Sequence, residues 1–247
     1  MNASLAYMRF ELLRTIRNRR VFVFSLAFPI VLYVLIAAPN RHEQSLGGTG
    51  ISAPLYFMIG LASFGTMNAM LSSGSRIAAE RTAGWNRQLR ITPLTTRQYF
   101  RAKIVTSYLL AIVALLALYV AGAALGVSLP ANRWLAMTGL IIVGLIPFAA
   151  MGVLLGHLLT ADSVGPAIGG TTAIFAFLGG SWFPITGGGF LEDLAKDLPS
   201  YWVVHAARAG LGVPHPWGTH GWAVVAIWSV AMIVLAGRAY QRDTERV

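Results

Sequence analysis

The sequence predicts an all-α integral membrane protein with six transmembrane helices, folded as one domain over residues 1–247. Hydrophobic residues make up 56% of the chain and charged residues only 11%, whereas about a quarter of a soluble domain is charged. Several apolar stretches approach the roughly 20 residues that a helix needs to cross a bilayer. No stretch shows the alternation of polar and apolar residues that a transmembrane β-barrel requires. Because lipid cannot satisfy backbone hydrogen bonds, the apolar stretches are expected to be helices.

The predicted spans are residues 21–38, 53–75, 104–127, 134–155, 164–183 and 221–237. The second span is the most polar, and Ser63, Thr66 and Asn68 in it are candidates for lining a substrate pathway. Hydroxyl groups that bond to carbonyls of their own helix are an equally good explanation. No span interior carries Asp, Glu, Lys or Arg, which disfavours an ion-coupled carrier.

Residues 1–20 precede the first span and form a basic, helix-prone segment. On a helical wheel Leu5, Met8, Leu12 and Ile16 share one face, and Tyr7, Glu11 and Arg14 lie opposite. This pattern predicts an amphipathic helix lying along the cytoplasmic leaflet. A signal peptide cleaved after Ala38 is the alternative, disfavoured because the basic segment is long and Pro39 follows the site.

Basic residues are distributed unevenly between the connecting segments. Of the 19 lysines and arginines, 15 fall in residues 1–20, 76–103 and 238–246. By the positive-inside rule both termini are cytoplasmic, and we expect a multi-pass protein of the plasma membrane. The net charge of +10 is then explained by arginines that contact anionic membrane lipids, and no nucleic-acid partner is expected.

The residue types that build catalytic and metal sites are sparse. There is no cysteine, and the five histidines are scattered at positions 42, 157, 205, 215 and 220. An intramembrane enzyme would need such groups clustered at membrane depth. We therefore predict no catalytic residue, no metal and no cofactor for this chain, and we interpret His157 and Asp162 as interfacial residues rather than a proton relay.

Small residues four apart recur at Gly122/Gly126, Gly152/Gly156 and Gly165/Gly169. Such pairs let helices approach closely. We expect each pair to pack within the bundle rather than to form a dimer seam.

The predicted loop of residues 76–103 contains the pattern Glu-Arg-x-x-Gly-x-x-x-x-Leu-x-x-x-Pro, beginning at Glu80. Local rules predict a short amphipathic helix over about 77–90 that ends before Pro93. From composition alone, an interfacial loop anchored by arginines is the simpler interpretation.

The pattern resembles the cytoplasmic loop of ABC type-2 permeases, the membrane subunits of drug, lipid and polysaccharide exporters, and the daunorubicin-resistance type most of all. A second match is the Gly179-Gly180 pair followed by Phe183-Pro184, Pro199 and Arg208. The chain departs from the family at Leu198-Pro199, where the family has Asn-Pro. The resemblance implies short re-entrant helices on the outer side within residues 184–219, with Phe183, Pro184, Pro199 and Arg208 at an outer gate.

The resemblance also implies a division of labour between subunits. The loop would be a coupling helix that contacts an ATPase subunit through Glu80, Arg81, Gly84, Arg87, Leu89, Arg90 and Pro93. ATP and Mg would bind to two partner ATPase subunits, since Lys103 and Lys196 each follow alanine and so cannot belong to a Gly-Lys-Ser/Thr phosphate loop.

The function expected on this basis is that of a permease subunit of an ATP-driven exporter, paired with a second copy or a paralogue. An apolar pathway favours an amphipathic drug or a lipid-like substrate. The alternatives are an ion-coupled secondary transporter and an intramembrane enzyme.

Overall fold

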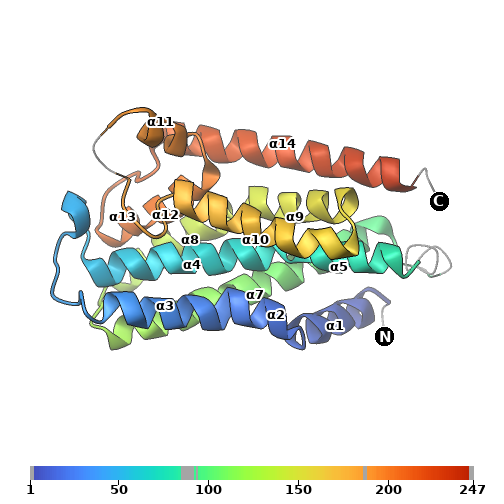
Figure 1. The fold of residues 1–247 in the computed structure, drawn as a ribbon, viewed down its shortest axis with the longest axis horizontal. Helices are drawn as coiled ribbons and strands as arrows, with labels where there is room; N and C mark the ends of the chain where they lie inside the picture. Colours follow the sequence, from blue (N-terminus) through green and yellow to red (C-terminus); the bar gives the residue numbers. More distant parts are fainter. Residues whose placement is uncertain (1–2, 85–91, 93, 186–187, 245–247) are drawn as a thin grey trace.

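The computed structural model describes residues 3–84, 92, 94–185 and 188–244, and every regular element in these ranges is a helix. The helices form one elongated bundle (Figure 1). The beginning of α1 (Ala3–Ile16) and the end of α14 (Gly218–Thr244) lie at the same end of the bundle, which we call the terminal end. The opposite end, the loop end, holds the short helices η2 (Leu46–Gly48), α11 (Phe190–Lys196), α12 (Pro199–His205) and α13 (Ala207–Gly210).

The longer helices run between these two ends. In chain order they are α2 (Arg19–Phe22) with η1 (Val23–Ala27) and α3 (Phe28–Ala37), α4 (Ala53–Leu71) with α5 (Ser73–Thr82), α7 (Thr96–Ala124), α8 (Ala131–Gly144) with α9 (Ile146–Leu158), α10 (Ala161–Leu178), and α14.

Four helical stretches are long and apolar enough to cross a membrane: Ala53–Thr82, Thr96–Ala124, Ala131–Leu158 and Gly218–Asp243. They coincide with the second, third, fourth and sixth predicted spans and extend beyond several of the predicted boundaries. The first predicted span corresponds to a shorter apolar stretch, Val23–Ala37, and the fifth to α10. The structure therefore supports a multi-pass, all-helical membrane protein.

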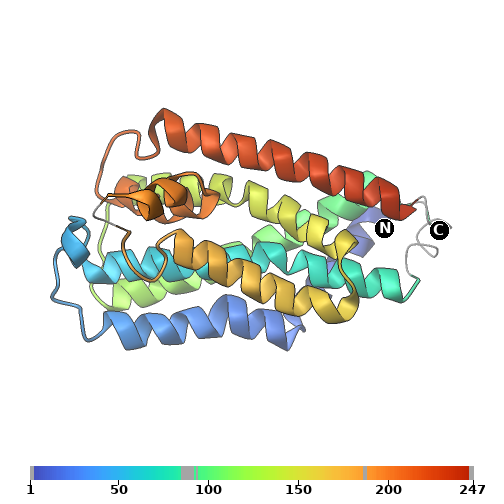
Figure 2. The same cartoon turned by 45° about the horizontal axis from the view of Figure 1, so that its top comes forward.

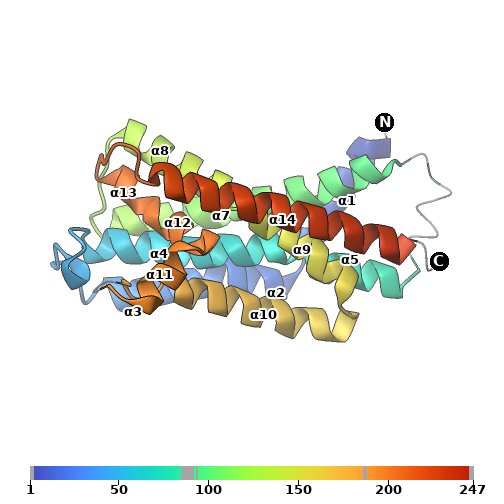
Figure 3. The same cartoon turned by 90° about the horizontal axis from the view of Figure 1, so that it is seen from above.

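Helix α4 is the centre of the bundle, with α3, α7, α9 and α10 around it (Figures 2 and 3). Every residue from Ala53 to Leu71 is buried. Protein rather than lipid surrounds this helix, which explains why its sequence tolerates more Ser, Thr and Asn than the other spans.

Glycines allow the closest helix contacts. A Cβ at Gly74 would lie 2.5 Å from the carbonyl oxygen of Gly152, and one at Gly156 would lie 2.8 Å from the carbonyl oxygen of Gly74. The Gly152/Gly156 pair thus packs α9 on α5 within the chain, as predicted. By contrast, Gly165 and Gly169 on α10 face open space.

Helix α1 buries its polar face and exposes its apolar face. Tyr7 and Glu11 are buried against the bundle, whereas Leu5 and Ile16 are 62% and 59% exposed. The protein therefore covers the polar side of α1, and the placement of this helix along the cytoplasmic leaflet stays a prediction.

The first part of the coupling helix predicted over residues 77–90 is helical, but residues 77–82 are the last part of α5 and not a separate helix. Helix α5 ends at Thr82, and Gly84 follows with φ +68°, the left-handed conformation that terminates helices. Residues 85–91 lie outside the described residues.

Candidate functional site

Three helices bring polar side chains together at the terminal end by the same four-residue spacing. Residues four apart lie on one face of a helix. The faces that meet carry Tyr7 and Glu11 on α1, Arg76 and Glu80 on α5, and Tyr99, Lys103 and Ser107 on α7. We call this set, together with Arg14, the Glu80 network.

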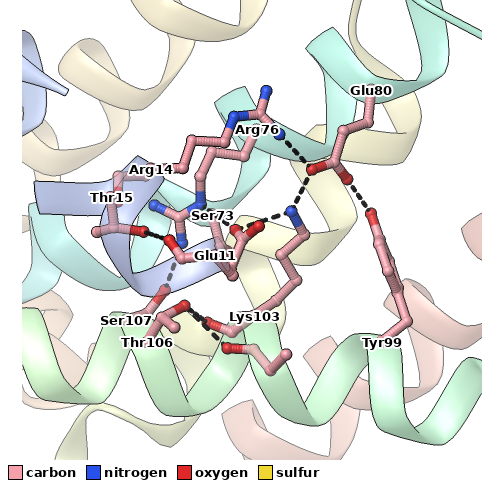
Figure 4. Close-up of polar contacts among 12 residues, drawn as sticks. Glu11, Arg14, Thr15, Ser73, Arg76, Glu80, Tyr99, Lys103, Thr106 and Ser107 are labelled. Carbon is pink, nitrogen blue, oxygen red and sulfur yellow. Dashed lines mark hydrogen bonds and ion pairs between the residues drawn. The ribbon is translucent and has the colours of Figure 1, made fainter. Parts of the chain in front are cut away.

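The Glu80 carboxylate receives three partners from two other helices (Figure 4). Lys103 Nζ lies 2.5 Å from its Oε1, and Arg14 Nη1 lies 2.6 Å from the same oxygen. The Tyr99 hydroxyl donates to Oε2 at 2.6 Å. Glu80 thereby joins the end of α5 to both α1 and α7.

Glu11 is the second acid of the network. Lys103 Nζ donates to its Oε1 at 2.8 Å, so the lysine connects the two carboxylates. Arg76 Nε lies 2.7 Å from the same oxygen as an ion pair, although it is not aligned as a hydrogen bond, and Arg76 Nη2 donates to Ser107 Oγ at 3.1 Å. The other Glu11 oxygen, Oε2, is buried without a hydrogen-bond partner.

The buried part of the network is electrically balanced. Glu11, Glu80, Arg76 and Lys103 are each at most 3% exposed, and their formal charges cancel. Removing one partner would leave a buried charge uncompensated, which typically costs about 3–5 kcal/mol. Burial and the nearby carboxylates of Glu80 and Glu11 raise the pKa of the Tyr7 hydroxyl, so this group stays protonated.

A second group of contacts begins at the next residue, Arg81; we call it the Arg81 network. Arg81 Nη2 lies 2.6 Å from Asp243 Oδ1 on α14. Its Nη1 donates to the carbonyl oxygens of Gly156 and Leu159 at 3.0 and 3.2 Å, at the end of α9. His157 Nδ1 lies 3.0 Å from Asp243 Oδ2, so α5, α9 and α14 meet there.

Neighbouring residues on a helix point about 100° apart. Glu80 therefore faces α1 and α7 while Arg81 faces α9 and α14. The last turn of α5, directly before the loop, is held on two sides by ionic contacts. A force applied to this loop would reach four other helices.

The remaining predicted coupling residues are only partly described. Gly84 is exposed, and a Cβ there would meet no described residue within 4 Å, so its observed role is to end α5. Arg87, Leu89, Arg90 and Pro93 lie outside the described residues.

Sequence reasoning did not identify Glu11, Arg76, Lys103 or Asp243 as members of a site. Arg76 and Lys103 stand one residue outside predicted spans, so both were interpreted as ordinary membrane anchors. The signal was the four-residue spacing of Arg76 with Glu80 and of Tyr99 with Lys103. Asp162 is exposed, as expected for an interfacial residue, whereas His157 is buried.

The predicted pathway residues of α4 are all buried. Ser63 and Thr66 donate to carbonyls of their own helix at Ile59 and Ala62, which supports the alternative interpretation of these two residues. Asn68 differs, because its Nδ2 donates 3.0 Å across to Ser25 Oγ on η1. The π-helical turn that presents Ser25 comes just before Pro29, which lacks an amide hydrogen and breaks the regular ladder.

Asn68 also lines a groove of about 680 Å³ between the first helical stretch, α4 and α10. Aromatic rings follow one another along it: Phe24 and Phe28 are 6.2 Å apart, Phe28 and Phe64 5.8 Å, and Phe64 and Trp182 5.9 Å. The Trp182 Nε1 is buried without a hydrogen-bond partner. The groove is thus an aromatic surface with a few polar groups.

At the loop end two of the four predicted outer-gate residues line a smaller pocket of about 190 Å³. Pro184 and Arg208 line it, Pro199 begins α12, and Phe183 is 67% exposed. The Tyr56 hydroxyl donates to the carbonyl of Gly180 and ties α4 to this region. Burial, and next the nearby Arg208, lower the pKa of His205 to about 4, so its ring is neutral at pH 7.

Among the described residues, no group of three or more His, Asp or Glu side chains is arranged to hold a metal ion.

Comparison with known proteins relates the sequence of this chain to membrane transport proteins. The family model of the ABC-2 family transporter proteins matches residues 40–238, so the chain belongs to this family. It is also similar to a protein of Bacillus subtilis (strain 168) named "Putative transport permease YvfS". The two are 25% identical over 198 residues, which cover 77% of this chain and 78% of the relative.

Proposed function

We propose that this chain is the permease subunit of an ATP-driven exporter, coupled to separate ATPase subunits through the loop after α5. Membership of the ABC-2 family supports a transport permease. The observation that carries the coupling proposal is the double attachment of the last turn of α5 by Glu80 and Arg81.

In this proposal Glu80 and Arg81 act behind the contact with the ATPase rather than in it. The sequence alone suggested that Glu80 bonds directly to the ATPase, but its carboxylate is 3% exposed and already has three partners. In this proposal the residues that contact the ATPase directly are Gly84, Arg87, Leu89, Arg90 and Pro93. When ATP closes the ATPase pair, motion of this loop pulls on α1 and α7 through Glu80 and on α9 and α14 through Arg81. Such a rigid connection suits a two-state, inward-to-outward transition.

The charge bias of the sequence orients the bundle with its terminal end in the cytoplasm. Six crossings, with the first helical stretch and α10 as the shorter ones, fit this orientation. The exposed residues Leu5 and Ile16 on the apolar face of α1 would then lie in the inner leaflet.

The aromatic groove lined by Asn68 is our candidate for half of the translocation pathway. A second copy of the chain, or a paralogue, would close the groove. The open faces of Gly165 and Gly169 on α10 support such a contact, because small residues allow helices to approach closely. A row of tilted aromatic rings with few polar groups suits an amphipathic drug or lipid-like molecule.

The test is transport in inside-out vesicles by the permease co-expressed with a candidate ATPase subunit. We expect uptake of an amphipathic dye that stops without ATP and survives a protonophore. Uptake that persists without ATP would contradict the proposal.

Two substitutions of Gly84 test whether the ATPase contacts this residue directly or whether Gly84 only shapes the end of α5. Gly84→Asn keeps the left-handed backbone accessible, whereas Gly84→Val strains it by about 1–2 kcal/mol. If the ATPase approaches Gly84 closely, both variants lose ATP-driven uptake although only the valine variant loses stability. Normal uptake by both variants would argue against close approach.

One observation favours a second candidate, an ion-coupled secondary transporter. Glu11 Oε2 is buried without a hydrogen-bond partner and could bind a proton. The predicted spans contain no charged residue, and this disfavoured an ion-coupled transporter. The helices of the structure extend beyond those spans and do contain charged residues. Uptake that collapses with a protonophore and is abolished in Glu11→Gln would favour this candidate.

A further inference from the structure

We propose that the groove between α8 and α14 at the loop end binds one phospholipid, with its phosphate on Arg133 and an acyl chain along α8. The site does not depend on how transport is driven. It depends only on the bundle being embedded in a membrane.

The groove has a volume of about 700 Å³; α8 forms one wall, and residues 209–217 together with Trp222 of α14 form the other. A Cβ at Gly139, in the middle of α8, would meet nothing within 4 Å, so the helix surface is open there. The other lining side chains on the two helices are largely apolar; they include Leu135, Leu140, Val143 and Trp222. Leu135 is 73% exposed and Trp222 49% exposed. An open apolar channel along a spanning helix is the shape that an acyl chain fills.

A cationic group stands at the end of this channel. Arg133 lies in the first turn of α8 and lines the groove. Among the described residues its guanidinium donates one hydrogen bond, a long one of 3.4 Å from Nη1 to the carbonyl oxygen of Gly210. Within the described ranges no carboxylate forms an ion pair with it. An arginine at a helix end beside an apolar channel has its donors available for a phosphate.

The residues next to Arg133 also favour a lipid headgroup at the membrane depth of Arg133. His215, at φ +51°, is the one described non-glycine residue in the left-handed region, and it places its exposed side chain at the groove. Trp217, also in the lining, is 1% exposed, and its indole Nε1 has no acceptor in the protein. An exposed tryptophan such as Trp222, at 49%, is typical of the membrane interface, where phosphates lie.

Charge and shape together identify the occupant as a phospholipid of the leaflet at the loop end, which is the outer leaflet in the orientation proposed above. A neutral acylglycerol would leave Arg133 without a counter-charge. A free phosphate ion would leave the apolar channel empty.

The experiment is native mass spectrometry of the full-length chain in detergent, titrated with phosphatidylglycerol after delipidation. We expect one tightly bound lipid per wild-type chain and at least tenfold weaker binding to Arg133→Gln. Gly139→Leu, which fills open space and replaces glycine by a better helix former, should weaken binding similarly. Arg41→Gln, which removes an exposed arginine from a loop at the same end and outside the groove, is the matched control and should bind like the wild type.

Three outcomes would overturn the proposal. The first is binding by Arg133→Gln within twofold of the wild type. The second is equal retention of diacylglycerol, which would remove the phosphate from the recognition. The third is thermal stabilisation by inorganic phosphate as large as that by phosphatidylglycerol. A variant that fails to fold is replaced by Arg133→Lys, for which weaker but detectable binding is expected.

Discussion

The two ionic networks start from consecutive residues of α5 but differ in their surroundings. The Glu80 network is buried, with Glu80 and Lys103 at most 3% exposed. The Arg81 network is partly open to solvent, with the side chains of Arg81 and Asp243 27% and 13% exposed. Glu80 bonds only to side chains, whereas Arg81 also bonds to the carbonyls that end α9.

This difference indicates different roles. Buried charges that lose a partner are costly, so the Glu80 network should hold α1 and α7 to α5 in every state of the protein. The Arg81–Asp243 pair is 27% and 13% exposed and is less costly to break, so the Arg81 network should contribute less to stability while it transmits loop motion to α9 and α14. The comparison leads to four predictions on stability.

The largest effect is expected from Lys103→Met, which leaves Glu11 and Glu80 facing each other without their shared cation. We expect a loss of about 3–5 kcal/mol, because both charges stay buried. This corresponds to a fall in Tm of about 10 °C, measurable by tryptophan fluorescence in detergent. Arg101→Met, an exposed position on the same helix, is the control, and an equal Tm for the two variants would contradict the account.

A smaller loss of stability is expected from substitutions in the Arg81 network. Arg81→Gln and Asp243→Asn should each cost about 1–2 kcal/mol, as for hydrogen bonds to charged groups. The double variant should cost less than the two single losses together, by about 1 kcal/mol. Additive losses would show that the two side chains do not interact.

Tyr99→Phe removes one hydrogen bond from Glu80 while Lys103 and Arg14 remain. We expect a loss of about 1 kcal/mol in thermal unfolding. Tyr7→Phe is the matched control, since the Tyr7 hydroxyl has no hydrogen-bond partner and its removal should be nearly neutral. If both variants have the same stability, the Tyr99 bond contributes nothing.

The smallest expected effect is that of salt on stability, and it should differ between the two networks. Raising KCl from 0.1 to 1 M shortens the Debye length from about 10 to about 3 Å. The stability difference between wild type and Arg81→Gln should shrink, whereas that between wild type and Lys103→Met should stay constant. If salt changed both stability differences equally, the two networks would be equally accessible to solvent, and this would contradict the comparison.

The fold class could be predicted from the sequence because long apolar stretches have few alternatives in a membrane. The polarity of α4 was visible in Ser63 and Thr66, but its central position was not, since burial by protein and burial by lipid favour similar residues. The buried network was missed for a clearer reason. Its acids and bases come from three helices distant in sequence, and each alone resembles an anchor at a membrane surface.

The central claim is that Arg81 transmits loop motion to α14 while Glu80 transmits it to α1. The chain has no cysteine, so spin labels can be placed at the exposed positions Arg9 on α1 and Arg238 on α14 without background. The measurement is the distance between these labels in the complex with the ATPase, with and without ATP bound by a hydrolysis-deficient ATPase variant.

The account predicts that ATP changes this distance in the wild type and that the change is largely lost in Arg81→Gln. An ATP-dependent change of the same size in Arg81→Gln would contradict it.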